Sequence, residues 1–497
     1  MTRNDWLLIL FSCFLFSASF PPLPLGFLAW FFLIPLLMAL ENASPRKGFK
    51  LAFFFGLISN FLLLYWIAWQ AFYGEIWVMP GSIAAIFILA LYPGLWGWLY
   101  CFIKKKLGNW VLLLAPFLWV GIEWVRSLWE IGFPWLDVGY TQTGYLSLIQ
   151  FASLFGISGV SLWVLFLNIF FYLLIEFRKN RFMLVSVSIL IVLFILVPYL
   201  YGRKTLSESV SAAKIKVALI QGNIDMNVKW NPRYLHHSLE TFYTLTQKAA
   251  SENPDLVIWP ETSAPCYLAY EPFYFGWVKN LSDSLNIPIV LGTDDYRTIE
   301  KNQYVFYNAV FYFKPQANLP EKYYKMQLVP FAEKLPLSGK MRVLNKIQLG
   351  QANFSSGENY TLFDSPKGKF GSLVCFEIAF PNLVRKFVQK NAGFMVNITN
   401  DSWFGKTAGP YQHASMSIMR AIENRISIAR CANSGISMLV DPYGRTLEKT
   451  ALFQQRNLIG EIPLKNKDTF FTKNGNIVAI LSFFLSLVFL LLSKFKK

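Results

Sequence analysis

Cysteine, histidine and charged side chains are all scarce in this chain of 497 residues. The cysteines are scattered and form no CxxC pair, which argues against a disulfide framework. They are Cys13, Cys101, Cys266, Cys375 and Cys431. The three histidines, His236, His237 and His413, have no metal-ligand spacing, so we expect no metal site. Charged residues make up 15% and hydrophobic residues 54%, both far from the average of soluble proteins.

The net charge of +17 does not indicate nucleic acid as a partner. A nucleic-acid-binding surface usually shows a dense basic stripe interleaved with aromatic residues, and the sequence has none. Residues 1–204 hold 13 Lys or Arg against 7 Asp or Glu, and residues 205–493 hold 30 against 22. Much of the excess in the N-terminal part stands in short loops beside apolar runs. We therefore expect a membrane protein that does not bind nucleic acid.

Long apolar runs fill the first 200 residues and the last 25. Most of them approach the ~20 residues that a helix needs to cross a bilayer. We predict eight transmembrane helices, at residues 6–22, 26–42, 49–69, 82–103, 109–127, 157–177, 182–201 and 474–493. The first run, preceded by Arg3, is similar to a cleaved signal peptide. A second apolar run follows within a few residues, which favours a retained helix.

Lysine and arginine mark alternate loops between these predicted spans. The marked positions are Arg46, Lys47, Lys50, Lys104, Lys105, Lys106, Arg178, Lys179, Arg181, Lys494, Lys496 and Lys497. The loops 21–25 and 70–81 contain no Lys or Arg, and 128–156 contains none either. By the positive-inside rule, both termini are cytoplasmic and residues 202–473 lie outside. We expect a seven-helix membrane bundle at 1–201, an extracytoplasmic domain at 202–473, and a final helix and tail at 474–497.

The outer domain has an α/β pattern. Strand-like runs occur at residues 214–220, 256–259, 287–291, 304–313, 371–374, 394–398 and 436–440, and helical patterns occur at 233–251 and 410–430. Mixed strands and helices in one unit of this size predict a layered α/β domain. The outer loop 132–142, GFPWLDVGYTQ, is aromatic enough either to cap the helix bundle or to serve substrate access.

Cys375 is the first candidate for chemistry. It follows a short apolar run and precedes a predicted helix at 382–390, and helix amide groups near a thiol favour the thiolate. Glu261 and Lys325 also stand in apolar surroundings, where a lone charge is costly and invites a partner. A glutamate near a thiol can take its proton, and a fixed lysine can stabilise an oxyanion. A buried ion pair beside an inert cysteine fits this spacing equally well.

Three short motifs in this order resemble the Glu–Lys–Cys signature of the nitrilase, or carbon–nitrogen hydrolase, superfamily. They are WPET at 259–262, KMQLVPFAE at 325–333 and VCFE at 374–377. Together with the membrane spans, they resemble the apolipoprotein N-acyltransferase family, the membrane-bound members of that superfamily. QGNIDMNVKW at 221–230, the loop 132–142 and the segment 400–437 extend the resemblance over nearly the whole chain. Ala332 and Phe376 depart from the family, which usually has Gly and often Tyr there.

The resemblance implies a fold and roles for individual residues. The outer domain would be an α-β-β-α sandwich. Glu261 would be the general base, Lys325 the oxyanion-stabilising cation and Cys375 the nucleophile that becomes a thioester. Glu333 would be a further essential glutamate that positions Lys325 or shuttles protons. Glu377 and Trp230 would support the acyl-enzyme.

The resemblance also implies a reaction and a location. An acyl chain would pass from a phospholipid to Cys375, and then to the α-amine of a diacylglyceryl-cysteine on an apolipoprotein, in a ping-pong cycle. No cofactor is implied, and we expect a monomer in the bacterial inner membrane with its catalytic domain on the periplasmic side. Aromatic residues at 267–277 and at Trp403 and Phe404 would serve either as lids or as ordinary packing.

Two other functions remain open at this point. A membrane-anchored amidase or nitrilase that hydrolyses a C–N bond would use the same Glu–Lys–Cys set. A transporter with an outer regulatory domain would need ionisable or broken positions along its spans. Glu123 is the main ionisable residue well inside a predicted span, which is thin support for transport.

Overall fold

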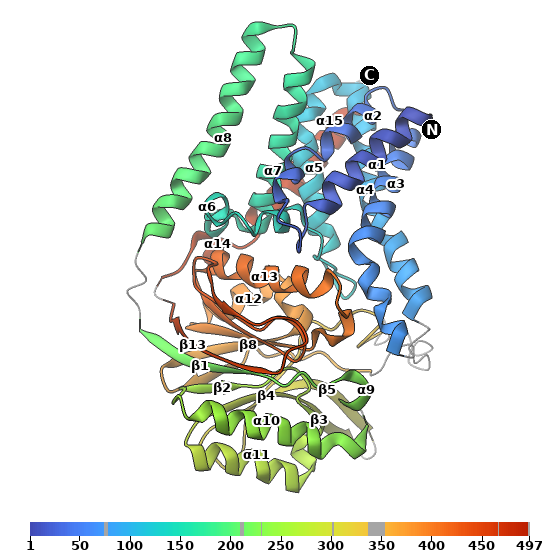
Figure 1. The fold of residues 1–497 in the computed structure, drawn as a ribbon. Coiled ribbons are helices and arrows are strands. Elements are labelled where there is room, and N and C mark those ends of the chain that lie inside the picture. Colours follow the sequence, from blue (N-terminus) through green and yellow to red (C-terminus); the bar gives the residue numbers. More distant parts are fainter. Residues whose placement is uncertain are drawn as a thin grey trace. The chain divides into compact units, whose positions relative to one another are not determined.

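The computed structural model describes residues 1–73, 78–208, 213–229, 231–300, 303–335, 353–465 and 467–495 (Figure 1). The chain divides into two compact units. The first comprises Met1–Ala71, Ile76–Glu208 and Asn474–Lys497, and the second comprises Phe72–Glu75 and Ser209–Lys473. The first unit is helical, and the second contains all the described strands.

Helices occupy the apolar runs of the first unit. They are α1 (Arg3–Ala18), α2 (Leu33–Leu40), α3 (Pro45–Leu64), α4 (Val78–Leu107), α5 (Val111–Arg126), α6 (Leu146–Ile149), α7 (Ala152–Glu176), α8 (Arg181–Ser207) and α15 (Ile477–Phe495). In the described residues a helix overlaps each of the eight predicted spans. Local signals start several of them: Thr2 and Asp5 form a capping box at α1, and Ser44 caps α3.

The predicted count of eight spans is not confirmed. Within the described ranges, five helical segments are long and apolar enough to cross a membrane: Pro45–Trp69, Val78–Arg126, Ala152–Glu176, Arg181–Ser207 and Ile477–Lys494. The helix α1 has 16 residues and α2 has 8, so both are shorter than a typical span. The helices α4 and α5 join into one segment through the 3₁₀ turn Gly108–Trp110.

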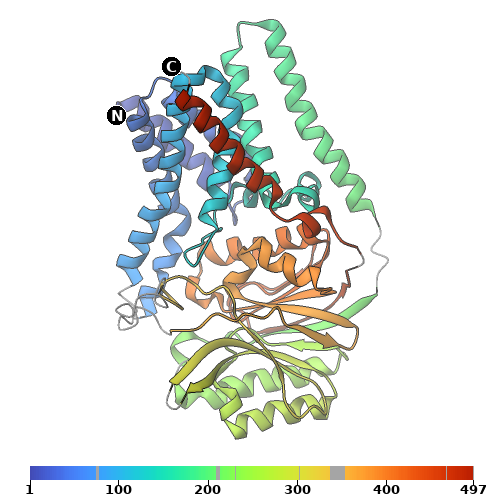
Figure 2. The same cartoon turned by 180° about the vertical axis from the view of Figure 1, so that it is seen from behind.

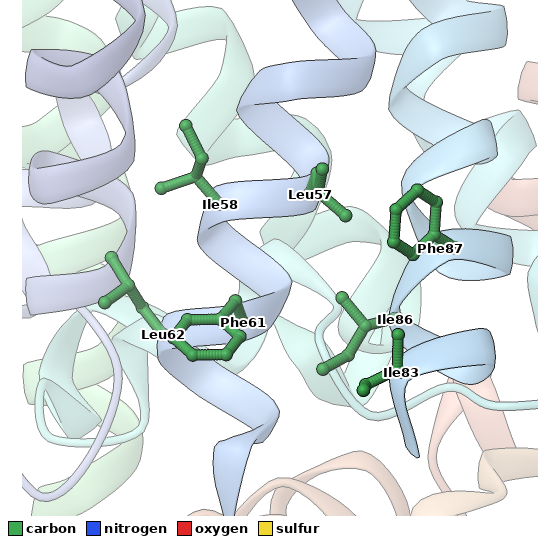
Figure 3. Close-up of a pocket in the computed structure, with 7 residues that line it drawn as sticks. All are labelled: Leu57, Ile58, Phe61, Leu62, Ile83, Ile86 and Phe87. Atoms are coloured by element: carbon green, nitrogen blue, oxygen red, sulfur yellow. The ribbon is translucent and has the colours of Figure 1, made fainter. Parts of the chain in front are cut away.

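Small residues let α3 and α4 approach closely. A Cβ at Gly48 would lie 2.5 Å from the sulfur of Cys101, and one at Gly97 would lie 2.5 Å from the Cβ of Ala52. Such contacts are typical of helix pairs in membranes. Elsewhere along the same pair the side chains leave an apolar pocket of about 370 Å³ (Figure 3). Its lining residues are Leu57, Ile58, Phe61, Leu62, Ile83, Ile86 and Phe87.

The loop 132–142 is packed into the first unit. Trp135, Val138 and Tyr140 are each at most 2% exposed. The Glu123 carboxylate of α5 accepts a hydrogen bond from the Val138 backbone N–H at 2.9 Å, and Arg126 pairs with Asp137 at 2.7 Å. These contacts support the interpretation of the loop as a cap of the helix bundle. They also give Glu123 a structural partner, which weakens the argument for a transport path.

The second unit is built on two sheets. Its strands are β1 (Lys214–Gln221), β2 (Leu256–Ile258), β3 (Ala264–Tyr267), β4 (Ile289–Glu300), β5 (Gln303–Phe313), β6 (Glu321–Tyr324), β7 (Leu362–Ser365), β8 (Gly368–Val374), β9 (Phe394–Thr399), β10 (Ser427–Ala432), β11 (Met438–Val440), β12 (Thr446–Lys449) and β13 (Arg456–Pro463). One sheet has the order β13-β1-β2-β4-β5-β6, with β3 beside β4, and the other has the order β12-β11-β10-β9-β8-β7.

Several α-helices accompany these two sheets. They are α9 (Met226–Lys229), α10 (Leu235–Ala250), α11 (Pro272–Leu285), α12 (Pro381–Gln389), α13 (Gly409–Asn424) and α14 (Phe470–Asn474). The helices α10 and α11 lie on the first sheet, and α12 and α13 lie on the second, in both views (Figures 1 and 2). The strands β1 and β10 join the inner faces. The expected α-β-β-α sandwich is confirmed.

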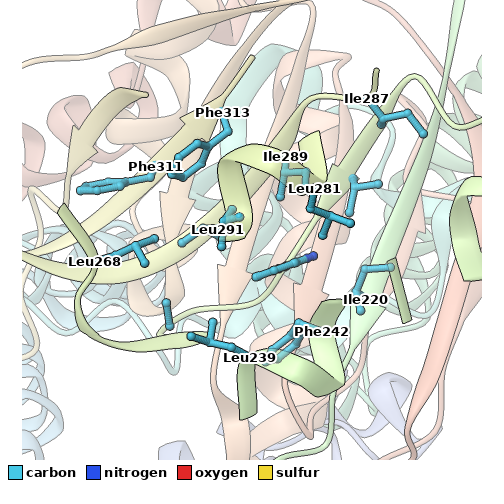
Figure 4. Close-up of a cluster of buried hydrophobic side chains, with 14 of the residues drawn as sticks. Ile220, Leu239, Phe242, Leu268, Leu281, Ile287, Ile289, Leu291, Phe311 and Phe313 are labelled. Carbon is cyan, nitrogen blue, oxygen red and sulfur yellow. The ribbon is translucent and has the colours of Figure 1, made fainter. Parts of the chain in front are cut away.

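One hydrophobic core of this unit lies between the first sheet and its two helices (Figure 4). Trp259, 1% exposed, stacks on Phe242 with ring centroids 5.3 Å apart. Its indole N–H donates to the Thr246 hydroxyl of α10 at 2.8 Å. The apolar residues before Glu261 therefore anchor that end of β2 in a rigid core.

One predicted element is wrong in its second half. The helix predicted at 410–430 ends at Asn424, because Arg425 takes a left-handed φ of +48°, and residues 427–432 form β10. All six residues of β10 are buried between β9 and β11. A strand buried on both faces has no alternating pattern, so its sequence does not distinguish it from a continuing helix.

Candidate active site

Cys375 lies at the end of β8, at the turn that the sequence predicted. Val374 is the last residue of the strand, and Cys375–Ala379 form a 3₁₀ turn before α12 begins at Pro381. Cys375 itself has a φ of +52°, in the left-handed region that non-glycine residues rarely adopt. The strained backbone at Cys375 therefore separates the end of β8 from the start of α12.

Two carboxylates lie beside the Lys325 ammonium. Lys325 Nζ donates to Glu333 Oε1 at 2.8 Å and lies 3.7 Å from Glu261 Oε1. The Asn308 amide Nδ2 donates to both carboxylates, at 2.9 Å to Glu261 and 3.2 Å to Glu333. The second oxygen of Glu261 accepts from the backbone N–H of Asn400 at 3.0 Å. The structure thus brings three of the predicted residues into one buried cluster.

Strands of the first sheet, and the residues just after them, hold this cluster. Glu261 follows β2, Asn308 lies within β5, and Lys325 follows the last residue of β6. The Lys325 backbone N–H donates to the Asn308 carbonyl at 2.9 Å, which fixes the height of the lysine along β5. Gly292 of β4 lets the backbone at Glu261 approach, since a Cβ there would lie 2.7 Å from the Glu261 Cα.

Burial and neighbouring charges shift the pKa values of Lys325 and Cys375. Burial alone would lower the pKa of Lys325, but the charges of Glu333 and Glu261 raise it well above its ordinary value. Burial raises the pKa of the Cys375 thiol, the Glu261 charge adds to that rise, and the Lys325 charge opposes it. The raised pKa runs against the expectation that helix amides favour the thiolate, and α12 begins only after an intervening turn.

Glu377 ties the Cys375 turn to the segment after Lys325. One carboxylate oxygen accepts from the Val374 backbone N–H at 2.7 Å. The other accepts from the Tyr323 hydroxyl at 2.8 Å and from the backbone N–H groups of Met326 at 2.7 Å and Gln327 at 3.1 Å. Burial raises the pKa of Glu377 to about 6. The predicted supporting position is thus a brace between two parts of the site.

Trp230, the remaining predicted site residue, lies outside the described residues. Its neighbour Lys229 is 3% exposed and donates to the Glu261 backbone carbonyl at 3.0 Å. Burial lowers the pKa of Lys229 to about 8 and raises the pKa of nearby Asp294 to about 7. The Lys229 ammonium is therefore a second buried ionisable group beside Glu261, at its backbone carbonyl.

Sequence reasoning missed Asn308 and Lys229. Asn308 interrupts the apolar and aromatic run of residues 304–313, and that lone amide is the signal that could have identified it. Lys229 stands inside the motif QGNIDMNVKW but was not assigned a role. Both donate hydrogen bonds to Glu261, and neither contact follows from spacing along the chain.

The aromatic segment 267–277 divides between packing and exposure. Phe275 and Trp277 pack against the core of the first sheet. Tyr270 and Phe273 are 49% and 68% exposed, respectively. The packing interpretation therefore holds for the inner residues, and a lid formed by the outer ones remains a prediction.

Comparison with known families gives two adjacent matches. The model of the apolipoprotein N-acyltransferase N-terminal domain matches residues 12–170, and that of the carbon-nitrogen hydrolase family matches residues 216–468. The first match covers most of the helical unit, and the second covers the two-sheet unit with the Glu261, Lys325 and Cys375 cluster.

Full-length relatives share both parts. The apolipoprotein N-acyltransferase of Geobacter metallireducens is 37% identical over 96% of this chain and 93% of its own length. That of Chlorobaculum tepidum is 31% identical, with coverages of 96% and 94%. Among solved structures, Saccharomyces cerevisiae Nit3, a member of branch 10 of the nitrilase superfamily, matches with a TM-score of 0.40 and 22% identity, over 52% of this chain and 92% of its own.

Proposed function

This chain belongs to the apolipoprotein N-acyltransferase family, and from that premise we propose its reaction, substrates and catalytic residues. It transfers a fatty acyl chain from a membrane phospholipid to the N-terminal amine of an S-diacylglyceryl-cysteine on an apolipoprotein. The transfer is ping-pong, through a thioester on Cys375. Glu261, Lys325 and Cys375 form the catalytic set.

One observation carries this assignment: the half-buried Cys375 thiol lies close enough to the Glu261 carboxylate and the Lys325 ammonium for both charges to shift its pKa. Because burial raises the pKa of Cys375, the thiol is protonated at neutral pH, so its attack requires a base. Glu261 takes the thiol proton while the sulfur attacks the ester carbonyl carbon. Lys325 then stabilises the oxyanion that forms.

The proton returns in each half of the cycle. Collapse of the first tetrahedral intermediate breaks the ester bond, and the leaving glycerol oxygen takes the proton from Glu261 as a lysophospholipid departs. The acceptor amine then attacks the thioester carbonyl, and Glu261 passes an amine proton to the departing Cys375 sulfur. Glu333 holds Lys325 at 2.8 Å throughout, and Glu377 braces the Cys375 turn. Trp230 supports the acyl-enzyme.

Location follows from the loop charges. We assign residues 1–201 to a membrane bundle, 202–473 to a periplasmic catalytic domain and 474–497 to a last helix with a cytoplasmic tail. Both termini face the cytoplasm, and the chain is a monomer in the bacterial inner membrane. A reporter fused within 202–473 is expected to be active only in the periplasm, and cytoplasmic activity would contradict this topology.

The alternatives have weaker support. A membrane-anchored amidase would share the Cys375 cluster, but the relatives that share both parts of this chain are named as acyltransferases. Glu123 gives no support to the transporter hypothesis, because its carboxylate accepts hydrogen bonds from Trp119 and from the Val138 backbone.

Cys375→Ala in the purified full-length protein tests the proposal. The assay supplies a phospholipid with a labelled acyl chain and a diacylated lipopeptide. Both lysophospholipid release and lipopeptide acylation should disappear, while the melting temperature stays near that of the unchanged protein. Cys266→Ala, which removes another partly buried thiol of the same unit, is the matched control and should keep both activities. Transfer retained by Cys375→Ala would sink the assignment.

A further inference from the structure

A buried polar network lies behind the Cys375 turn. Leu373, Asn397 and Arg430 are register partners across the three adjacent parallel strands β8, β9 and β10. Asn397 and Arg430 are 0% exposed. The Arg430 guanidinium donates to Asn397 Oδ1 at 2.5 Å and to Asp401 Oδ2 at 2.8 Å. A buried arginine is stable only with such partners, so this end of the sheet is fixed by charge as well as packing.

His413 of α13 connects this network to the nucleophile. Its Nε2 lies 3.1 Å from the backbone carbonyl oxygen of Cys375, and its Nδ1 lies 2.9 Å from Asp401 Oδ1 and 3.0 Å from Arg430 Nη2. A carbonyl oxygen can only accept, so Nε2 carries the proton. Burial, with the Arg430 charge, lowers the pKa of His413, and the Asp401 carboxylate beside Nδ1 opposes that fall.

The network touches Cys375 at two further points. Asn397 Nδ2 lies 3.5 Å from the same Cys375 carbonyl, a longer and weaker contact than that of His413. The Thr399 hydroxyl donates to Asp401 at 2.9 Å and also interacts with the Cys375 thiol. The carbonyl and the thiol of the nucleophile are thus both held from the side of the sheet.

We propose that His413 is a positioning residue for the nucleophile. Its Nε2–H holds the Cys375 carbonyl and so keeps this residue in the left-handed conformation, φ +52°, that presents the thiol to Glu261 and Lys325. A non-glycine residue does not keep this conformation without compensating contacts. The inference rests on the proposed role of Cys375 as nucleophile. It gives a role to His413, which takes no part in the proposed chemistry of Glu261, Lys325 and Cys375.

Two amide substitutions separate positioning from general packing. In His413→Gln, the amide nitrogen can occupy the place of Nε2 and still donate to the Cys375 carbonyl. In His413→Asn, the shorter side chain can reach only the place of Nδ1, beside Asp401. Both variants replace the ring with a smaller amide, so a purely structural role would damage them alike.

The experiment compares both variants in the full-length protein in detergent. We expect His413→Gln to form the Cys375 acyl-enzyme within about threefold of the unchanged rate, and His413→Asn to be slowed tenfold or more. KM for the phospholipid and the melting temperatures of the two variants should agree. Alkylation of Cys375 by iodoacetamide, followed against pH by peptide mass, should shift in His413→Asn and not in His413→Gln.

Other outcomes would overturn the inference. Equal rates in the two variants would show that the bond to the Cys375 carbonyl is not needed. Equal losses accompanied by equal falls in melting temperature, or failure of His413→Gln to fold, would assign His413 to structure alone. Asn397→Asp keeps an acceptor for Arg430 but removes the weaker donor, and should slow acylation less than His413→Asn. Failure of the proposed function is distinct, because the unchanged protein would then form no Cys375 adduct.

Discussion

Replacing Glu333 with glutamine tests whether Glu333 keeps the Lys325 ammonium from pairing with Glu261, the proposed general base. In the structure Lys325 Nζ is 2.8 Å from Glu333 and 3.7 Å from Glu261. At an effective dielectric constant of ~20, these distances correspond to attractions of about 6 and about 4.5 kcal/mol. The difference of about 1.4 kcal/mol, close to a factor of ten, keeps the ammonium on Glu333.

Glu333→Gln removes that preference and leaves the size of the side chain nearly unchanged. Lys325 then pairs with Glu261, which occupies the base and draws the cation away from the oxyanion. We expect acyl-enzyme formation to slow by about tenfold or more, since 1.4 kcal/mol is tenfold in rate, with KM for the phospholipid little changed. The measurement is the rate of the lysophospholipid burst in rapid-quench experiments, with intact mass reporting the Cys375 adduct.

Glu321→Gln is the matched control for this prediction. Glu321, on β6, also pairs with a lysine, Lys314, but that pair is partly exposed and is expected to contribute little. Its acylation rate should therefore equal that of the unchanged protein. An unchanged burst rate in Glu333→Gln would refute the idea that Glu333 keeps Lys325 from neutralising Glu261.

Three further predictions concern the support of the site. Gly292→Ala should slow acylation, because its Cβ would lie 2.7 Å from the Glu261 Cα, whereas Gly276→Ala, with nothing within 4 Å, should not. Burial raises the pKa of Glu377 from 4.5 to about 6. This shift contributes about 2 kcal/mol to the free energy of unfolding below pH 4.5, and the contribution is lost as the pH rises through 6. The melting temperature of the unchanged protein relative to that of Glu377→Gln should fall over that range, and a constant difference would contradict the argument. Burial opposes ionisation of Asp401, but the charges of Arg430 and His413 lower its pKa from 3.8 to about 2. The protein should therefore lose about 2 kcal/mol of its free energy of unfolding as the pH falls from 4 toward 2. Asp401→Asn should show no such loss.

Local patterns in the sequence predicted the two-part architecture. Apolar runs and loop charges identified the membrane unit, because a helix in lipid must satisfy its backbone within one continuous segment. The strands β1, β2, β5, β8 and β9 were predicted within about one to three residues of their observed ends. The count of spans was less secure, since α1 and α2 are short and α4 and α5 run together.

The chemical residues divide in the same way. Glu261, Lys325, Glu333 and Cys375 each stand in a short recognisable motif, so the sequence alone identified them as candidates. Their partners lie far away along the chain. Asn308 is 47 residues from the carboxylate to which it donates, and His413 is 38 residues from the carbonyl that it contacts.

The sequence by itself therefore determined a membrane-embedded helical unit, an α/β unit and the motif residues of the candidate site. Only the tertiary structure decided that Lys325 rests on Glu333 rather than Glu261, that burial and the Glu261 charge raise the pKa of the Cys375 thiol, and that residues 427–432 form a strand. The physical reason is common to all three. Burial and long-range contacts set charge, hydrogen bonding and strand pairing, and these depend on which distant segments the fold brings together.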